Sequence, residues 1–568
     1  MANNNIASPG IYFNENDQSF IPQGVIEAGG AIVGPTVKGP VQRPTLVTSY
    51  NDYVSKFGAV LESSSAQYSF YTSTAAYNYF NNGGTTLLVS RVVSGTYSHA
   101  TASVTGTGKT SFQLNTLAEG LEQNSTSSQN AGGLLDSGSI NNIRWEIQNA
   151  NTESGRFNLL IRRGDDSTND KVVLEQFNNI SLDPFDPNFI GSAVGTQRTE
   201  VQGTGANVYL ETIGDFPNIS RYVYVTDISE TPNYSDAEGN VRVASYSSSV
   251  PSNSNGGFGG GAGEVTAGAK FGKDITSDNI QGVSANDYTA SFHLLNDPNF
   301  TYTSIVAPGL DYTNHSTQLN VLLNNIKDRA DALAVIDLQN YSHGATVTGL
   351  ANQAKSINNS YAAAYAPWLL SKDPVTGRQV WSPASTFIPG VYAYNDKVGE
   401  PWFAPAGLNR GSLPTVLKTQ KGFAKADRDT LYDAKVNPIA VFPRSGVVVF
   451  GQKTLQTKAS ALDRINVRRL LITVKQFLDQ QAGNVVFEQN TTATRNNFLA
   501  VINPYLESVQ QRQGLYAFKV VMDESINTPA VIDRNELVGQ IFLQPTKTAE
   551  FIILNFNVQP TGATFPES

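Results

Sequence analysis

The residues in this chain whose types and spacing could do chemistry are few, and the first candidate is a phosphate-binding loop. Residues 105–110 read TGTGKT, which ends like the loop whose backbone N–H groups cradle nucleotide phosphates. That motif needs a glycine five positions before Gly108, and Ser103 stands there. No helical pattern follows, so the sequence predicts a surface turn and not a nucleotide site.

A second glycine-rich segment lies at residues 251–263, which read PSNSNGGFGGGAG. Its glycine spacing can be fitted to a dinucleotide-binding fingerprint, but that fingerprint has meaning only between a strand and the start of a helix. Ser and Asn precede the glycines and more Gly follows. The composition therefore predicts a flexible loop.

Histidines and nucleophile motifs indicate no active site. No two histidines have the i, i+4 or HExxH spacing of a zinc site, and no GxSxG segment marks a hydrolase nucleophile. The chain has no cysteine, which excludes disulfides, thiolate metal sites and cysteine nucleophiles. We therefore predict no catalytic residue, no cofactor, no metal site and no enzyme activity. The histidines are His99, His293, His315 and His343.

Two pairs of carboxylates could bind a cation. Asp165 is followed by Asp166, and Asp183 is followed three residues later by Asp186. Both pairs lie in Asn- and Ser-rich stretches, which are typical of solvated loops. We expect solvated side chains here, and a weak cation site stays open as the alternative.

A basic helix face is the strongest candidate for recognition. Residues 461–480 carry one apolar face, and Arg464, Arg468 and Lys475 follow at steps of four and seven, with Arg469 beside them. These cations could be an ordinary solvated face. Alternatively, they form a patch for an acidic partner surface. A neighbouring copy could supply that surface from Asp523, Glu524, Asp533 and Glu536.

The elements that must position these residues alternate between strands and helices. Apolar runs at 87–93, 304–307 and 333–337 predict strands, and the leucine stripe at 319–330 predicts a helix between two of them. That order favours a parallel crossover. Towards the C-terminus, a helical face at 498–509 precedes strand candidates at 515–522, 538–543 and 551–558. The fold class is therefore a mixed α+β and α/β multidomain protein.

A change in composition suggests the domain division. Residues 101–205 are rich in Ser, Thr, Asn and Gly with short strand-like runs, and we interpret them as an inserted β-rich outer domain. The remaining divisions are an extended N-terminal arm at 1–25, a discontinuous middle domain at 26–100 plus 206–300, an α/β domain at 301–450 and a C-terminal α+β domain at 451–568.

Composition narrows the classes of protein that fit. The chain has 568 residues, 10% aromatic and 15% charged, with a net charge of −9. Disordered chains have few aromatics and high net charge, so a mostly disordered chain is excluded. Few clustered cations argue against direct nucleic-acid binding. No signal peptide is evident and no apolar run approaches the ~18 residues of a membrane span. We therefore expect a soluble product made in the cytoplasm, without membrane insertion.

The order of short segments along the chain resembles one family, the contractile tail sheath proteins of myoviruses, related to sheaths of R-type pyocins and other contractile injection systems. The most specific part is the end of the chain from residue 431 onward. It includes GVVVFGQKTL at 446–455, where the family usually has Arg in place of Lys453. The departures lie at about 100–290, where sheath proteins carry variable outer insertions. The other matching segments are residues 8–15, 34–40, 57–58, 79–84, 89–92, 305–309, 360–369, 389–396, 404–407, 431–438, 466–470, 487–490 and 527–529.

The resemblance implies a structural subunit of a virion tail, assembled in the host cytoplasm. Its partners would be further copies of itself in stacked hexameric rings and a helical polymer, the inner tail tube protein, and the baseplate and tail terminator proteins. Contraction would drive the tube through the target envelope. Strand exchange between subunits would complete the sheath core, through Ile11, Tyr12, Phe13, Asn14 and Glu15 in the arm and Phe551, Ile552, Ile553, Leu554, Asn555 and Phe556 in the tail. We expect Arg464, Arg468, Arg469 and Lys475 to contact the tube or a neighbouring subunit.

Two rival functions fit parts of the sequence. A β-rich surface or adhesion protein would suit the Ser, Thr, Asn and Gly content, but it predicts a secretion signal and repeats, and neither is evident. A hydrolase would need the nucleophile motifs that are missing.

Overall fold

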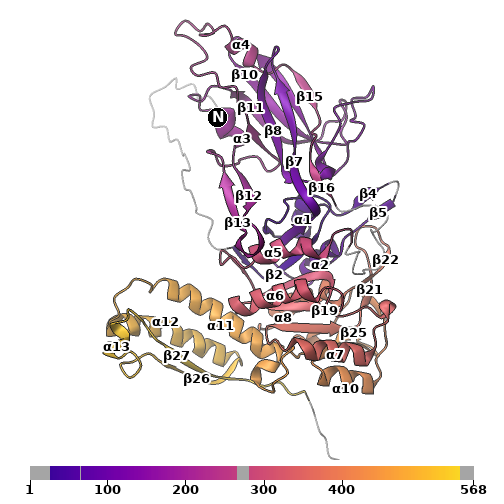
Figure 1. Cartoon of the computed structure of the whole chain (residues 1–568), viewed down its shortest axis with the longest axis vertical. Helices are drawn as coiled ribbons and strands as arrows, with labels where there is room; N and C mark the ends of the chain where they lie inside the picture. Colours follow the sequence, from indigo (N-terminus) through magenta and orange to yellow (C-terminus); the bar gives the residue numbers. More distant parts are fainter. Residues whose placement is uncertain (1–25, 64–65, 265–280, 551–568) are drawn as a thin grey trace, which may run out of the picture.

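The computed structural model describes residues 26–63, 66–264 and 281–550. At its centre is an eight-stranded sheet in which six neighbouring strands run parallel (Figure 1). Most of these six strands are buried along their whole length, as expected where both faces of a sheet are covered. The order across the sheet is β25 (Gly446–Val449), β24 (Val436–Phe442), β20 (Ala362–Ala366), β19 (Leu333–Asp337), β18 (Ser304–Asp311), β2 (Gly30–Pro35), β6 (Leu87–Val92) and β3 (Thr45–Val47).

Helices cover both faces of this sheet. Successive strand residues point to opposite faces, so Ala334 and Ile336 belong to one hydrophobic core while Leu333 and Val335 belong to the other. The first core is covered by α5 (Tyr288–Leu294), α6 (Ser316–Arg329), α7 (Val347–Ile357) and α10 (Lys425–Asp433). The second is covered by α1 (Tyr50–Phe57), α2 (Tyr71–Asn81) and α8 (Ile388–Val398).

A β-sandwich stands above the central sheet in Figure 1. Its two four-stranded sheets share one core, in which the Phe112 and Phe157 rings stack with centroids 5.8 Å apart. One sheet contains β7 (Ser94–Thr105), β8 (Thr110–Glu119), β14 (Val223–Thr226) and β16 (Ala262–Glu264). The other contains β9 (Ile143–Asn151), β10 (Arg156–Arg163), β11 (Val173–Ser181) and β15 (Ser254–Gly256).

The glycine-rich segment at 251–263 is not the flexible loop that its composition predicts. It supplies an edge strand to each sheet of the sandwich, β15 and β16, and between them Phe258 is buried in the shared core. Glycine is needed for a close approach here, because a Cβ on Gly257 would lie 2.2 Å from the Ser125 carbonyl oxygen. The prediction of a flexible loop was wrong because burial of the Phe258 ring and the pairing of β15 and β16 hold the glycine-rich backbone in one conformation.

The C-terminal lobe lies to one side of the central sheet (Figure 1). It consists of α11 (Ile465–Gly483), α12 (Thr492–Gln511) and a β-hairpin of β26 (Leu515–Val521) and β27 (Gln540–Pro545). A separate core that includes Trp402, Leu470, Ile502 and Leu506 joins the helices to the hairpin.

The smaller elements complete the description. Hairpin or short-sheet strands are β1 (Ile26–Ala28), β4 (Leu61–Ser63), β5 (Ala66–Tyr68), β12 (Arg198–Gln202), β13 (Tyr209–Ile213), β17 (Phe300–Tyr302), β21 (Leu369–Lys372), β22 (Gln379–Ser382) and β23 (Val416–Thr419). Short helices are α3 (Ile190–Val194), α4 (Tyr246–Ser249), α9 (Gly407–Arg410) and α13 (Pro529–Ile532). None of the described helices is long and apolar enough to cross a bilayer.

The mixed α/β multidomain fold class is confirmed, with two differences in detail. Strand β18 does not stop before Pro308 but continues to Asp311, because Gly309 adopts a positive φ of 103° and the strand pairing shifts register there. Helix α11 begins at Ile465, so Arg464 is its N-cap residue and lies outside the helix.

Candidate assembly interface

The hairpin of β26 and β27 is one of four two-stranded sheets in the described chain, and it is the one that lies in the C-terminal lobe. It forms a two-stranded sheet, and no third strand pairs with either edge within the described residues. One face packs Phe518, Ile541 and Leu543 against the helices of the lobe, while Tyr516 and Phe542 are exposed on the other side. Two-stranded sheets are marginal alone and offer unpaired N–H and C=O groups at both edges.

The residues predicted to exchange between subunits lie outside the described residues. These are Ile11, Tyr12, Phe13, Asn14 and Glu15 near the N-terminus and Phe551, Ile552, Ile553, Leu554, Asn555 and Phe556 near the C-terminus. The described chain ends at Glu550, directly before the second group. Strand exchange therefore stays a prediction.

Arg464 contacts the end of the described chain. Its guanidinium donates to both carboxylate oxygens of Glu550, at 2.7 and 3.0 Å, and also to Asp463 at 2.8 Å. About a quarter of the Arg464 side chain is exposed. This arginine thus joins two parts of the same chain that lie 86 residues apart in the sequence.

Arg468 points into the body of the chain. It is 3% exposed and donates to the backbone carbonyl of Ser360 at 3.2 Å and to the Ser360 hydroxyl at 2.7 Å. The guanidinium also lies 3.9 Å from the centre of the Tyr361 ring, a cation–π contact. Burial lowers the pKa of Arg468, and the neighbouring tyrosine opposes that change.

Arg469 joins the C-terminal lobe to the central body. It is 4% exposed, pairs with Asp396 on α8 at 2.5 Å, and lies 4.7 Å from the centre of the Tyr392 ring. Burial by itself lowers the pKa of Arg469, but the Asp396 carboxylate outweighs it and the pKa lies above its ordinary value. Arg468 and Arg469 are therefore bonded within the chain, a placement that helical spacing alone did not reveal.

Lys475 is the most exposed of the four predicted cations. Its ammonium lies 3.0 Å from the Tyr361 hydroxyl and 3.3 Å from the Ala330 carbonyl, at the surface of α11. The acidic residues proposed as its complement are also exposed: Asp523, Glu524, Asp533 and Glu536. Whether any of the four basic residues contacts another chain stays a prediction.

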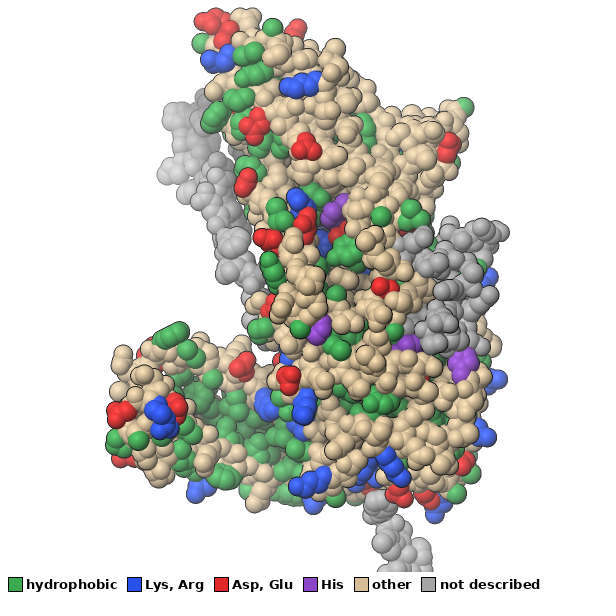
Figure 2. All heavy atoms as spheres, viewed as in Figure 1, with side chains coloured by type: hydrophobic (Ala, Val, Ile, Leu, Met, Phe, Trp, Pro, Cys, Tyr) green, Lys and Arg blue, Asp and Glu red, His purple; other side chains and the backbone are tan. Residues whose placement is uncertain are grey.

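A wide groove separates the C-terminal lobe from the central body. It has a volume of about 2090 Å³ and is lined by aromatic and aliphatic side chains that include Phe477, Phe498 and Ile541. Figure 2 shows hydrophobic side chains gathered in this hollow. Gln476 also lines the groove, and its side-chain amide donates to the Tyr302 and Asp331 carbonyls at 3.4 and 3.1 Å.

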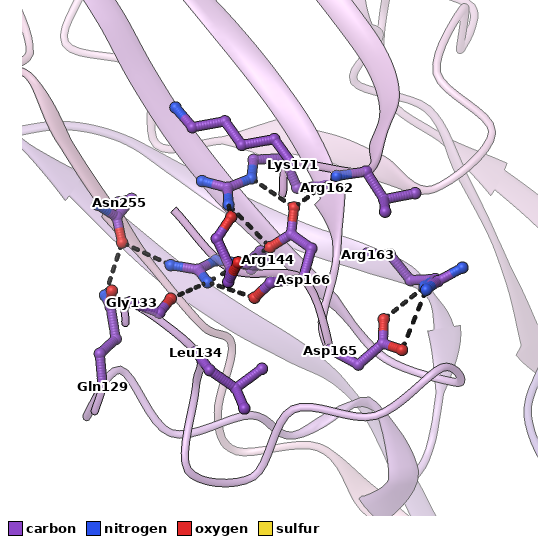
Figure 3. Close-up of polar contacts among 12 residues, drawn as sticks. Gln129, Gly133, Leu134, Arg144, Arg162, Arg163, Asp165, Asp166, Lys171 and Asn255 are labelled. Atoms are coloured by element: carbon purple, nitrogen blue, oxygen red, sulfur yellow. Dashed lines mark hydrogen bonds and ion pairs between the residues drawn. The ribbon is translucent and has the colours of Figure 1, made fainter. Parts of the chain in front are cut away.

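The paired aspartates of the sandwich behave differently from the solvated loops predicted for them. Asp166 is 3% exposed, and Arg162 donates to its two oxygens at 2.7 and 2.8 Å, with Arg144 3.4 Å away (Figure 3). Arg162 also pairs with Glu146 at 2.6 Å. The prediction was wrong at Asp166 because guanidinium groups four and 22 residues earlier fold over it. The two arginines already neutralise the carboxylate that was suggested as a ligand for a weakly bound cation.

The other aspartates of these pairs also have partners. Asp165 pairs with Arg163 at the surface of the sandwich, and Asp186 pairs with Arg156 at 2.5 Å. Asp183 accepts hydrogen bonds from the backbone N–H groups of Phe185 and Tyr234. No group of three or more His, Asp or Glu side chains in the described parts of the chain could hold a metal ion.

One buried carboxyl group in the central sheet should make stability depend on pH. Asp337 ends β19 and accepts hydrogen bonds from the Ser385 N–H at 3.0 Å and its hydroxyl at 2.5 Å. Burial raises the pKa of Asp337 from 3.8 to about 7, despite those hydrogen bonds, and Asp311 on the adjacent strand raises it further.

We expect this shift to stabilise the protein in acid. A raised folded-state pKa means that the contribution is full below about pH 4 and is lost as the pH rises through about 7. Asp337→Asn mimics the neutral carboxyl, so the melting temperature of the wild type should fall relative to the variant between about pH 4 and pH 8. Parallel melting curves across that range would contradict the assignment.

Comparison with known proteins gives the same family over much of the chain. The family model for the phage tail sheath protein central domain matches residues 281–455, and that for the phage tail sheath C-terminal domain matches residues 457–559. The tail sheath protein of Vibrio phage KVP40 is 34% identical over 307 residues, 50% of this chain and 46% of that protein. The tail sheath protein of Enterobacteria phage T4 is 36% identical over 212 residues, 37% of this chain and 32% of that protein.

A solved structure shares the fold. The crystal structure of a sheath tail protein from Listeria innocua superposes with a TM-score of 0.52 at 11% identity, and the match covers 88% of this chain and 89% of that one. The chain spans less than half the length of the two phage relatives it matches. The adjoining family models and the sequence identities nevertheless agree, and residues 281–559 of the chain belong to the phage tail sheath protein family, a family of structural tail proteins.

Proposed function

We propose that this chain is the repeating subunit of a contractile tail sheath. In this proposal, copies stack as hexameric rings into a helical tube around the inner tail tube, and contraction drives that tube through the target envelope. The tube protein, the baseplate and the tail terminator would be its other partners in the virion tail. The observation that carries the proposal is the two-stranded sheet of β26 and β27, which lies within the matched C-terminal family domain and has both edges unpaired among the described residues.

Strand addition to this hairpin would link the subunits. Residues 11–15 and 551–556 are rich in β-branched and aromatic side chains, which favour extended pairing. Each added backbone hydrogen bond would contribute about 0.5–1.5 kcal/mol net. A few such bonds at each junction would tether neighbours while leaving the large domains free to rotate during contraction.

The charged residues of α11 have different places in this proposal. Arg468 and Arg469 are buried in contacts within the chain, whereas Lys475 is exposed. We therefore propose that Lys475 is the residue of this helix that binds an acidic surface of the tube or of a neighbouring subunit. The β-rich outer domain, proposed at residues 101–205, would then lie on the outside of the tube.

Proline substitutions test the strand exchange. Tyr12→Pro and Ile553→Pro each remove a backbone N–H from a proposed added strand and fix φ near −65°. We expect both variants to remain folded and to form no tubes in negative-stain electron microscopy. Asn4→Pro and Ala563→Pro are matched controls in the same terminal segments but outside the proposed strands, and they should assemble like the wild type.

Two results of the same microscopy would contradict the proposal. Tubes of normal length from both Tyr12→Pro and Ile553→Pro would exclude the two segments as linking strands. Uniform monomers from the wild-type chain at high concentration would contradict the sheath function itself, and would favour the surface-protein alternative.

A further inference from the structure

The chain after β27 returns from the C-terminal lobe to the body and is held there at Glu550. Arg464 binds both oxygens of this carboxylate, at 2.7 and 3.0 Å. The Tyr432 hydroxyl donates to it at 2.9 Å and the Gln452 side-chain amide at 3.1 Å. We call these four residues the tail clamp. Its members come from four separate places: α10, the loop after β25, the N-cap of α11 and the chain after β27.

The tail clamp is more buried than an ordinary surface ion pair, and its arginine binds both carboxylate oxygens. Only 16% of the Glu550 side chain and 26% of the Arg464 side chain are exposed. An arginine that binds both oxygens of one carboxylate fixes its direction as well as its position. Gln452 also donates to the Thr548 hydroxyl at 2.6 Å, so the clamp holds two residues of the same short segment.

A second layer of contacts fixes the clamp residues themselves. The Lys453 ammonium donates to the Tyr432 carbonyl at 2.8 Å and lies 3.8 Å from the centre of the Tyr432 ring. Lys435 and Arg464 both pair with Asp463, at 3.5 and 2.8 Å. Lys435 directly precedes β24, and the Lys453 N–H donates to Asn437 on β24, so the clamp joins the end of the described chain to the eight-stranded sheet.

We infer that the tail clamp fixes the point at which the C-terminal tail leaves the subunit, so that force on an exchanged tail passes to the central sheet and not to the hairpin. This inference deepens the proposed function and rests on it. Glu550 directly precedes Phe551, the first residue of the proposed linking strand. Without the clamp, the contacts that hold Thr548 and Glu550 against the body would be lost, and a force on the tail would act directly on β27. A fixed exit also reduces the ordering entropy lost when the tail binds a neighbour.

Limited trypsin digestion of the full chain, at a concentration below that of tube formation, tests the clamp itself. Lys547 lies inside the clamped segment, and cleavage after it releases residues 548–568, which intact mass spectrometry detects. Lys547 and Thr548 are already exposed, but a clamped segment cannot readily take the extended form that a protease binds. Glu550→Gln and Arg464→Gln should each accelerate this cleavage roughly tenfold, because they free the segment to open locally. The control Glu507→Gln neutralises an exposed carboxylate on α12 and should leave the cleavage rate unchanged.

Tube assembly by the same variants tests the transfer of force. Glu550→Gln tubes should need about tenfold more protein to form than wild-type tubes and should break at lower shear. Ile553→Pro separates this inference from the proposed function, because it should abolish tubes while Lys547 stays protected. Unchanged cleavage in both folded clamp variants would overturn the clamp, and wild-type tube strength in Glu550→Gln would overturn its role in transmitting force.

Discussion

Asp166→Asn is expected to destabilise the β-sandwich by about 3–5 kcal/mol, because it leaves two buried guanidinium groups without their shared anion. Arg144 and Arg162 are 0% and 1% exposed, and Asp166 lies between them. In the variant, Arg162 would keep its ion pair with Glu146, which Lys171 shares, but Arg144 would lose its ion pair with Asp166. Hydrogen–deuterium exchange of β9 and β10 measures the change locally, without requiring the whole chain to unfold in one step.

The neighbouring aspartate provides a matched control. Asp165 pairs with Arg163, and 27% and 40% of these two side chains are exposed, so water screens the pair. Asp165→Asn makes the same chemical change one residue away and should alter stability by less than about 1 kcal/mol. Equal exchange rates in the two variants would show that the buried arginines do not depend on Asp166.

Arg469→Glu is the second substitution with a large expected effect. It would place a carboxylate at the buried position 469, beside the Asp396 carboxylate, which is 34% exposed, and would remove the cation from the Tyr392 ring. Like charges in such a site destabilise strongly, so we expect a loss of about 3–5 kcal/mol and faster amide exchange in α11. Thermal unfolding and exchange of the unassembled chain measure both effects.

Lys475→Glu makes the same reversal of charge on the exposed side of α11. Because Lys475 is exposed and has no carboxylate partner among the ion pairs of the described residues, the stability of the unassembled chain should change by less than about 1 kcal/mol. If the proposed contact with an acidic partner is right, this variant should still assemble poorly. A melting temperature for Arg469→Glu equal to that of Lys475→Glu would contradict the structural role of Arg469.

The central sheet could be predicted because its strands carry a strong local signal. A parallel strand covered on both faces needs an uninterrupted apolar run, and residues 333–337 match β19 at both ends. Strand β18 was predicted too short because Pro and Gly usually end a strand, whereas a positive φ at Gly309 lets this strand continue. The extra length of β18 depends on the backbone conformation of Gly309, which the pattern of apolar residues does not indicate.

The candidate site was less predictable, because charge patterns do not reveal which cations are buried. Arg468 and Arg469 look like surface residues by type, but both fold against aromatic rings and oxygen acceptors supplied from more than 60 residues away. The prediction that Asp166 is solvated was wrong for the same reason. Arg162 stands four residues before it, but the contact of Arg144 depends on the pairing of β9 with β10.

The tail clamp could not have been found from local sequence either. Glu550 lies in an ordinary polar segment after a strand, and its partners are 86 to 118 residues away. Nothing in their spacing indicates a contact, since it results from the return of the chain from the lobe to the central body.

The most direct test of the sheath proposal is a cryo-electron microscopy reconstruction of the assembled protein at a resolution that traces the backbone. We expect stacked six-membered rings in which strands from residues 11–15 and 551–556 of neighbouring copies pair with the free edges of β26 and β27. A reconstruction in which that hairpin remains two-stranded, or in which the copies form no tube, would contradict the proposal.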